Sequence, residues 1–69
     1  MYNLEHNMRE QILDMWTEVK TLVETLEIDI HKNANGNKSA GVRVRKGLRL
    51  LKNKSGVLVK ASLSARDNE

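Results

Sequence analysis

The chain has 69 residues and no cysteine, so we expect one small domain without disulfides or thiolate metal sites to stabilise it. Proline and phenylalanine are absent, only four glycines occur and 30% of the residues are charged, which favours long helices over a strand-rich fold. With one tryptophan and one tyrosine, the composition also argues against a single-strand nucleic-acid binder built on stacked aromatic side chains.

The net charge of +3 averages two unlike halves. Residues 1–36 contain three basic and seven acidic side chains, whereas residues 37–69 contain nine basic and two acidic ones, giving −4 against +7. A segment as basic as the second half is typical of proteins that bind an acidic partner. No apolar run approaches the roughly 20 residues that cross a bilayer, and Glu5 stands where a signal peptide would be basic. We therefore expect a soluble protein that is not exported.

Apolar residues recur in steps of four and three along the first half, which predicts a helix over about residues 4–32. They form one stripe, consisting of Leu4, Met8, Ile12, Met15, Val19, Leu22, Leu26 and Ile30. A seven-residue series of Trp16, Val23 and Ile30 flanks this stripe. Four acidic residues fall on the solvated side: Glu10, Asp14, Glu18 and Glu24.

A turn over about residues 33–38 is predicted by the polar run around Gly36, a residue suited to ending a helix. Either Asn37 or Ser39 is a suitable N-cap for a second helix over about residues 39–65. The predicted seam of that helix is smaller and more polar, and consists of Ala40, Val44, Leu48, Leu51, Ser55, Leu58, Ser62 and Ala65. Its three glycines, Gly41, Gly47 and Gly56, either weaken the helix by about 1 kcal/mol each or permit close backbone approach.

Two helices of similar length joined by a short turn predict an all-α, antiparallel, coiled-coil-like hairpin. A lone hairpin cannot cover its apolar flanks, so we expect a homodimer that forms a four-helix bundle, with a tetramer as a further possibility. The predicted dimer interface combines Trp16, Val23 and Ile30 with Leu50, Val57 and Ala61. The alternative is that these flanks are simply exposed apolar surface.

Catalysis finds little support in the sequence. Gly36-Asn37-Lys38-Ser39 lacks the glycines of a phosphate-binding loop, and His6 and His31 lie near opposite ends of the first helix. Acidic pairs on that helix have neither a nucleophile nor a pocket beside them. We expect no enzyme activity, no metal, no cofactor and no small-molecule substrate.

The second helix carries a basic stripe about 33 Å long, close to one turn of duplex. Its members are Lys38, Arg45, Arg49, Lys52 and Lys60, with Arg43, Lys46 and Lys54 beside them. Basic heads spread along a whole face favour non-specific binding to phosphates over base recognition. The alternative is a basic face that pairs with the acidic helix or with an acidic protein. Membrane binding is a weaker hypothesis, because Ser55 and Ser62 interrupt the apolar face of the second helix.

From Gly36 to Lys46 the chain resembles the linker-histone-like nucleoproteins of chlamydiae and their short bacterial relatives. That family has a Gly-Asn-Lys-Ala-Ala-type turn followed by small residues and an Arg-x-Arg-Lys-type start to its second helix. The matching positions are Gly36, Asn37, Lys38, Ala40, Arg43, Arg45 and Lys46, with Ser39 in place of an alanine.

The resemblance implies a helical, self-associating protein that binds DNA without marked sequence preference, compacts it and lies in the cytoplasmic nucleoid, or in a viral particle if the source is a virus. The matched basic positions, Lys38, Arg43, Arg45 and Lys46, would contact the DNA. One departure is that chlamydial members have a lysine- and alanine-rich tail, whereas this sequence ends Ser-Ala-Arg-Asp-Asn-Glu. Either the second helix alone binds DNA in this short form, or the chain has become an interaction module.

Overall fold

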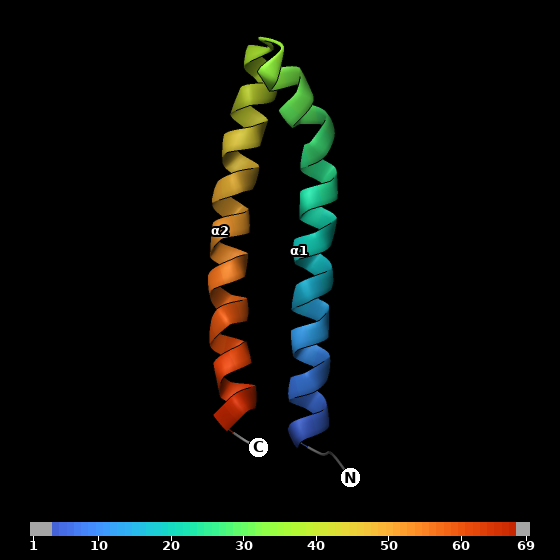
Figure 1. Ribbon diagram of the computed structural model, residues 1–69, viewed down its shortest axis with the longest axis vertical. Coiled ribbons are helices and arrows are strands. Elements are labelled where there is room, and N and C mark those ends of the chain that lie inside the picture. Colours follow the sequence, from blue (N-terminus) through green and yellow to red (C-terminus); the bar gives the residue numbers. More distant parts are fainter. Residues whose placement is uncertain (1–3, 68–69) are drawn as a thin grey trace.

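The protein forms two long antiparallel helices joined at one end by a tight turn (Figure 1). This computed structural model describes the backbone of residues 4–67 and the side chains of residues 8–65. Helix α1 spans Leu4–Ala34 and helix α2 spans Lys38–Asp67, and no strand occurs in this part of the chain. The all-helical hairpin predicted from the sequence is confirmed. Both helices reach further into the turn than the expected bounds of 32 and 39.

The turn combines a glycine helix end with an asparagine cap. Gly36 has a φ of 98°, in the left-handed region that glycine adopts at little cost. Its N–H donates to the Asn33 carbonyl and the Asn37 N–H donates to the Lys32 carbonyl, each at 2.9 Å, the hydrogen-bond pair of a Schellman motif. Asn37 then caps α2, since its Oδ1 accepts a hydrogen bond from the Ala40 N–H at 2.9 Å. Of the two candidate caps, Asn37 is therefore the one used.

The seam between the helices follows strict steps of four and three residues on both α1 and α2. On α1 the buried and half-buried side chains are Met8, Ile12, Met15, Val19, Leu22, Leu26, Asp29 and Asn33. On α2 the corresponding positions are Ala40, Val44, Gly47, Leu51, Lys54, Leu58, Ala61 and Ala65, with Ser55 half-buried beside them. The buried apolar side chains of the seam, Val19, Leu26, Ala40 and Val44, lie between the middle of the hairpin and the turn, and Gly41 and Gly47 are also buried there.

Three residues predicted for the seam lie outside it. Ile30 and Leu48 are 43% and 44% exposed, and Ser62 is also exposed. The polar or small residues one position earlier in the chain, Asp29, Gly47 and Ala61, occupy the seam instead. In the first two pairs the sequence pattern selected the larger apolar residue, and in the third it selected Ser62 over Ala61. The helices instead approach along a seven-residue repeat that passes one position away. Leu4, also predicted for the seam, lies outside the described side chains.

Gly47 leaves room for a side chain of α1 in the seam. A Cβ at this position would collide with the side chain of Leu26, which is only 5% exposed. Gly41 is similarly restricted, because a Cβ there would lie 2.7 Å from Asn33 Nδ2. By contrast, Gly56 faces open space. Close contact with side chains therefore accounts for Gly41 and Gly47, and the helix-weakening effect applies to Gly56.

Candidate nucleic-acid interface

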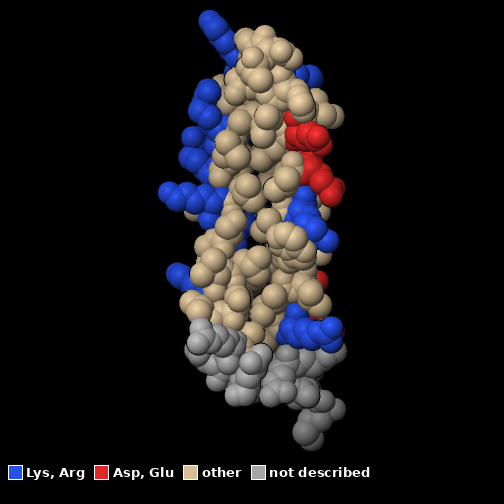
Figure 2. Space-filling model, viewed as in Figure 1, with Lys and Arg blue, Asp and Glu red and all other residues tan. Residues whose placement is uncertain are grey.

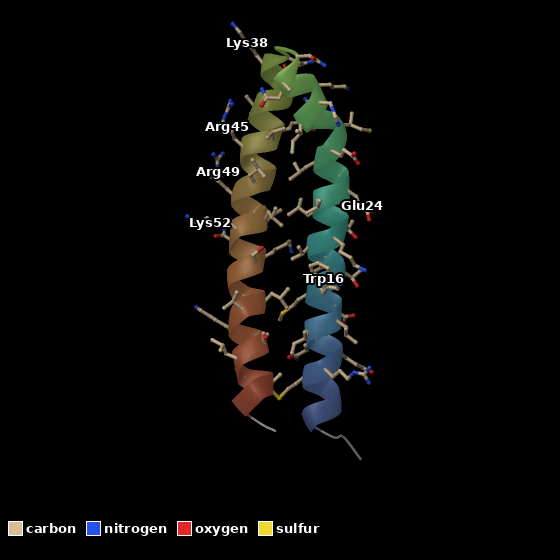
Figure 3. All side chains as sticks on the ribbon, viewed as in Figure 1. Trp16, Glu24, Lys38, Arg45, Arg49 and Lys52 are labelled. Atoms are coloured by element: carbon tan, nitrogen blue, oxygen red, sulfur yellow. The ribbon has the colours of Figure 1, made fainter. Side chains whose placement is uncertain are left out.

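A row of basic side chains occupies the outer side of α2, away from α1. Lys38, Arg45, Arg49 and Lys52 all project from this edge in Figure 3, and Figure 2 shows the same edge lined with Lys and Arg. Lys46 and Lys60 are also exposed on α2. From here on, the basic stripe comprises these six residues, namely the five expected from the sequence together with Lys46. Glu24 projects from the opposite edge of the hairpin, so one outer edge is basic and the other carries acidic groups (Figure 3).

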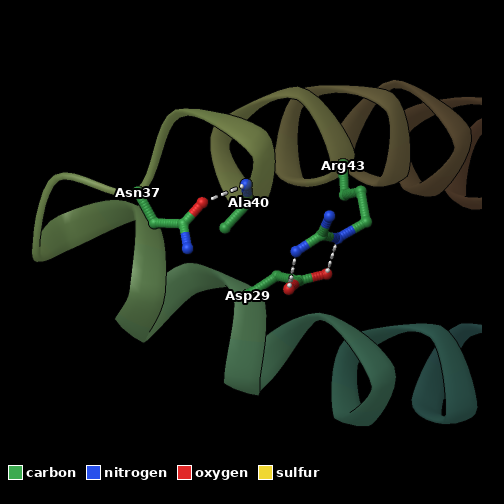
Figure 4. A network of polar contacts seen from close by, with 4 residues as sticks. All are labelled: Asp29, Asn37, Ala40 and Arg43. Carbon is green, nitrogen blue, oxygen red and sulfur yellow. Dashed lines mark hydrogen bonds and ion pairs between the residues drawn. The ribbon is translucent and has the colours of Figure 1, made fainter.

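Arg43 is separated from the basic stripe by an ion pair with α1 (Figure 4). Its Nε donates to Asp29 Oδ2 and its Nη2 donates to Asp29 Oδ1, both at 3.0 Å. The hydrogen bonds from Arg43 hold the pKa of Asp29 below its ordinary value, and the carboxylate raises the pKa of Arg43. A phosphate would have to compete with this bidentate contact for the guanidinium.

Lys54 is the second basic residue that α1 engages. Its Nζ lies 3.6 Å from Glu18 Oε2, and the lysine side chain is 33% exposed because it occupies a seam position. The sequence left open that basic residues of the second helix pair with the acidic first helix, and Arg43 and Lys54 do so. Among the side chains of residues 8–65, no ion pair engages any member of the basic stripe.

These two ion pairs were not predicted, although the sequence held a usable signal. Once the turn is centred on Gly36, residues equally distant from it on the two helices lie at the same height. The pairs Asp29 with Arg43 and Glu18 with Lys54 both satisfy this relation. The residue numbers of such a pair sum to about 72, a relation that identifies residues at the same height. Arg45 and Glu27 also satisfy it but form no ion pair, because Arg45 projects from the outer edge of α2.

The residues predicted for a dimer interface lie on two sides of the seam. Trp16 lines a hollow with Ser55 and Ser62, whereas Val57 lines a second hollow with Glu18. Val23 and Ile30 follow Trp16 at seven-residue steps and lie on its side, and Leu50 precedes Val57 by seven and lies on the other. Ala61 is in the seam itself. The structure therefore does not bring Leu50 and Val57 together with the Trp16 series.

Other site types receive no support from the residues that the structure describes. No group of three or more His, Cys, Asp or Glu residues in this part of the chain could hold a metal ion, and His6 lies outside the described side chains. Neither α1 nor α2 is apolar enough over its described length to cross a membrane.

The fold and its charge distribution define a small helical hairpin with a basic outer edge, a form suited to binding polyanions. The family model described as histone H1-like protein Hc1 matches residues 7–68, which is nearly the whole chain. The chain therefore belongs to the family of histone H1-like proteins Hc1. This is a family of DNA-packaging nucleoid proteins and not a known enzyme family. Comparisons with curated proteins and with solved structures gave no significant match.

Proposed function

We propose that this protein binds double-stranded DNA without sequence specificity and coats, bridges or compacts it through the basic stripe on α2. The observation that carries the proposal is that six basic residues lie exposed on one edge of one helix, free of ion pairs to the described side chains of α1. Membership of the histone H1-like family supports DNA as the polyanion.

The stripe suits phosphate contacts because Lys38 and Lys60, at its ends, are 22 residues apart on one continuous helix. At 1.5 Å per residue this separation is about 33 Å, close to one turn of B-form duplex. Lysine and arginine heads at this spacing displace counterions from phosphates of any sequence. Asn53 is the one side-chain amide within residues 38–65, which leaves few groups to read base edges.

We further propose that the protein is a homodimer of hairpins, associated with the nucleoid. Only four apolar side chains are buried, and eleven large apolar ones are more than 40% exposed in the described part of the chain. A single hairpin of this size has too little core to be comfortably stable, so burial of those side chains by another copy supplies what it lacks.

Gel shifts with two duplexes of unrelated sequence test the proposal. We expect equal affinities for the two duplexes and a steep loss of affinity as salt rises. If about five phosphates are neutralised per hairpin, the slope of log affinity against log salt is near −4 to −5. No retention at low salt, a clear preference for one duplex, or affinity that does not change with salt would contradict it.

A second candidate function is a coiled-coil interaction module that does not bind nucleic acid. The exposed apolar side chains on both sides of the seam favour it. Sedimentation with and without DNA separates the two functions, because an interaction module self-associates but sediments independently of DNA.

A further inference from the structure

One face of the hairpin is apolar along most of its length. We call it the Trp16 face; it consists of Trp16, Val23 and Ile30 from α1 with Leu48, Ser55 and Ser62 from α2. Trp16 and Val23 are 48% and 51% exposed, and Leu48 is 44% exposed. The space-filling view shows the uncharged surface running between a basic edge and a mixed edge (Figure 2). Near the open end, Trp16, Ser55, Leu58, Val59 and Ser62 line a hollow of about 410 Å³.

Side-chain size alternates along this face in a complementary way. The α1 members are large, whereas at the corresponding heights α2 presents Ser55, Leu48 and Gly41. Residues whose numbers sum to about 72 lie level with one another, as the contacts Leu26 to Gly47 and Glu18 to Lys54 establish. Trp16 is therefore level with Ser55, Val23 with Leu48, and Ile30 with Gly41.

A second copy can cover this face in two symmetric orientations. With both turns at the same end, α1 of each copy lies on α2 of the other, so Trp16, Val23 and Ile30 face Ser55, Leu48 and Gly41 of the second copy. The layer of Trp16 then pairs a large side chain with a small one, the layer of Val23 pairs two of medium size, and each hollow receives the indole of the other copy. In the third layer Ile30 packs over Gly41 and the Asn33 and Arg45 side chains that lie beside it. Interiors of proteins are filled by this kind of alternation.

With the turns at opposite ends, like helices meet. Trp16 then faces Ile30 of the second copy, so the contact between the two α1 helices is overfilled. Ser55 faces Gly41 of the second copy, so the contact between the two α2 helices is underfilled. Charge favours neither orientation, because each one places one pair of opposite charges and one pair of like charges against each other. The first sets Glu27 against Arg45 and Lys20 against Lys52, and the second sets Lys20 against Glu27 and Arg45 against Lys52. The first orientation also brings the exposed Leu13 and Val59 together.

We propose that two copies pair through the Trp16 face with their turns at the same end, and that the resulting dimer bridges two duplexes. In this orientation the two α2 helices lie at diagonal corners of the bundle, so the two basic stripes point in opposite directions. One straight duplex cannot contact both stripes. The opposite orientation would place both stripes on the same side and would coat a single duplex. The bridging part rests on the proposed function, whereas the pairing does not.

Cross-linking of introduced thiols tests the orientation, since the chain has no cysteine of its own. A Leu13→Cys chain is mixed with a Val59→Cys chain, treated with a short bismaleimide and weighed by mass spectrometry. We expect a cross-linked heterodimer. The matched mixture of Leu13→Cys with Ala34→Cys, positions that meet only when the turns are at opposite ends, should give none. Cross-linking in the second mixture alone, or a monomer in both, overturns the pairing.

Capture of a fluorescent duplex by an immobilised one tests bridging. Val23→Glu should be less stable than the native chain, because it loses the second copy, so the assay is run at a temperature where circular dichroism shows it to be helical. It should then still shift a single duplex, but capture should fall by about tenfold or more because the bivalent contact is lost. Val57→Glu is the matched control: Val57 is 54% exposed on the other side of the seam, and capture should be unchanged. Equal losses for both variants overturn the pairing. A cysteine-free chain that shifts no duplex refutes the proposed function, while the cross-linking result still decides the pairing.

Discussion

Arg43 and Asp29 join the two helices beside the turn through two parallel hydrogen bonds of 3.0 Å. The contact divides the basic residues of α2 into two groups, because Arg43 is held by α1 whereas Arg45, two residues later, projects from the outer edge (Figures 3 and 4). The two arginines look equivalent in the sequence but have different surroundings.

Arg45→Gln should therefore weaken DNA binding more than Arg43→Gln. Loss of one phosphate contact makes the slope of log affinity against log salt shallower by about 0.9. We expect this change for Arg45→Gln and less than half of it for Arg43→Gln in gel shifts across a salt series. Equal changes would show that DNA recruits Arg43 away from Asp29.

The same ion pair makes stability depend on pH in a definite direction. The folded state lowers the pKa of Asp29 below its ordinary value of 3.8, so the pair stabilises the hairpin above that pH. The contribution is lost as the pH falls through the lowered pKa. Thermal melts of the native chain and of Asp29→Asn should differ at pH 7 and converge in strong acid. Arg43 is exposed and Asp29 is only half-buried, so salt should reduce the difference. A difference that persists unchanged at the lowest pH would contradict this.

Two glycine substitutions should have opposite effects on stability. Gly56→Ala adds a methyl group in open space and should stabilise the hairpin by about 1 kcal/mol through helix propensity. Gly47→Ala gains the same propensity but forces Leu26 aside, and overpacking costs about 1–3 kcal/mol, so we expect it to be less stable than the native chain. Urea unfolding followed by circular dichroism measures both. Equal stabilisation by the two variants would mean that the helices can move apart at no cost.

Removal of the N-cap of α2 should also destabilise the protein. Asn37→Ala leaves the Ala40 N–H without its acceptor and should cost about 1 kcal/mol in the same unfolding assay. Ser39→Ala is the control, and we expect a change within about 0.5 kcal/mol. A larger loss of stability for Ser39→Ala than for Asn37→Ala would show that Ser39 is the N-cap of α2.

The sequence was informative about the hairpin because its strongest signals are local. Steps of four and three predict each helix, and Gly36 with Asn37 marks the turn. Prediction failed at Asp29, Gly47 and Lys54, whose place in the seam depends on how the two helices meet. A charged or missing side chain carries no hydrophobic signal, so Ile30 and Leu48 were assigned to the seam in place of Asp29 and Gly47.

Much of the candidate interface could likewise be predicted. The exposure of Lys38, Arg45, Arg49 and Lys52 follows from their angular position on α2 alone. The pairing of Arg43 and Lys54 with carboxylates of α1 depends on residues 14 and 36 positions away, which no periodicity within one helix reveals. The division of the apolar flanks into two sides similarly required the register of the hairpin.

Binding of DNA by the outer edge of α2 is tested by comparing the salt dependence of duplex binding for two triple variants with the same change in net charge. One replaces Arg45, Arg49 and Lys52 of α2 with glutamate, and the other replaces Arg9, Lys20 and Lys32, which are exposed on α1. We predict that the α2 variant stays helical but shifts no duplex at low salt, whereas the α1 variant keeps a slope near that of the native chain, about −4 to −5 per hairpin. Equal loss of binding in the two variants, or retained binding by the α2 variant, would contradict the account.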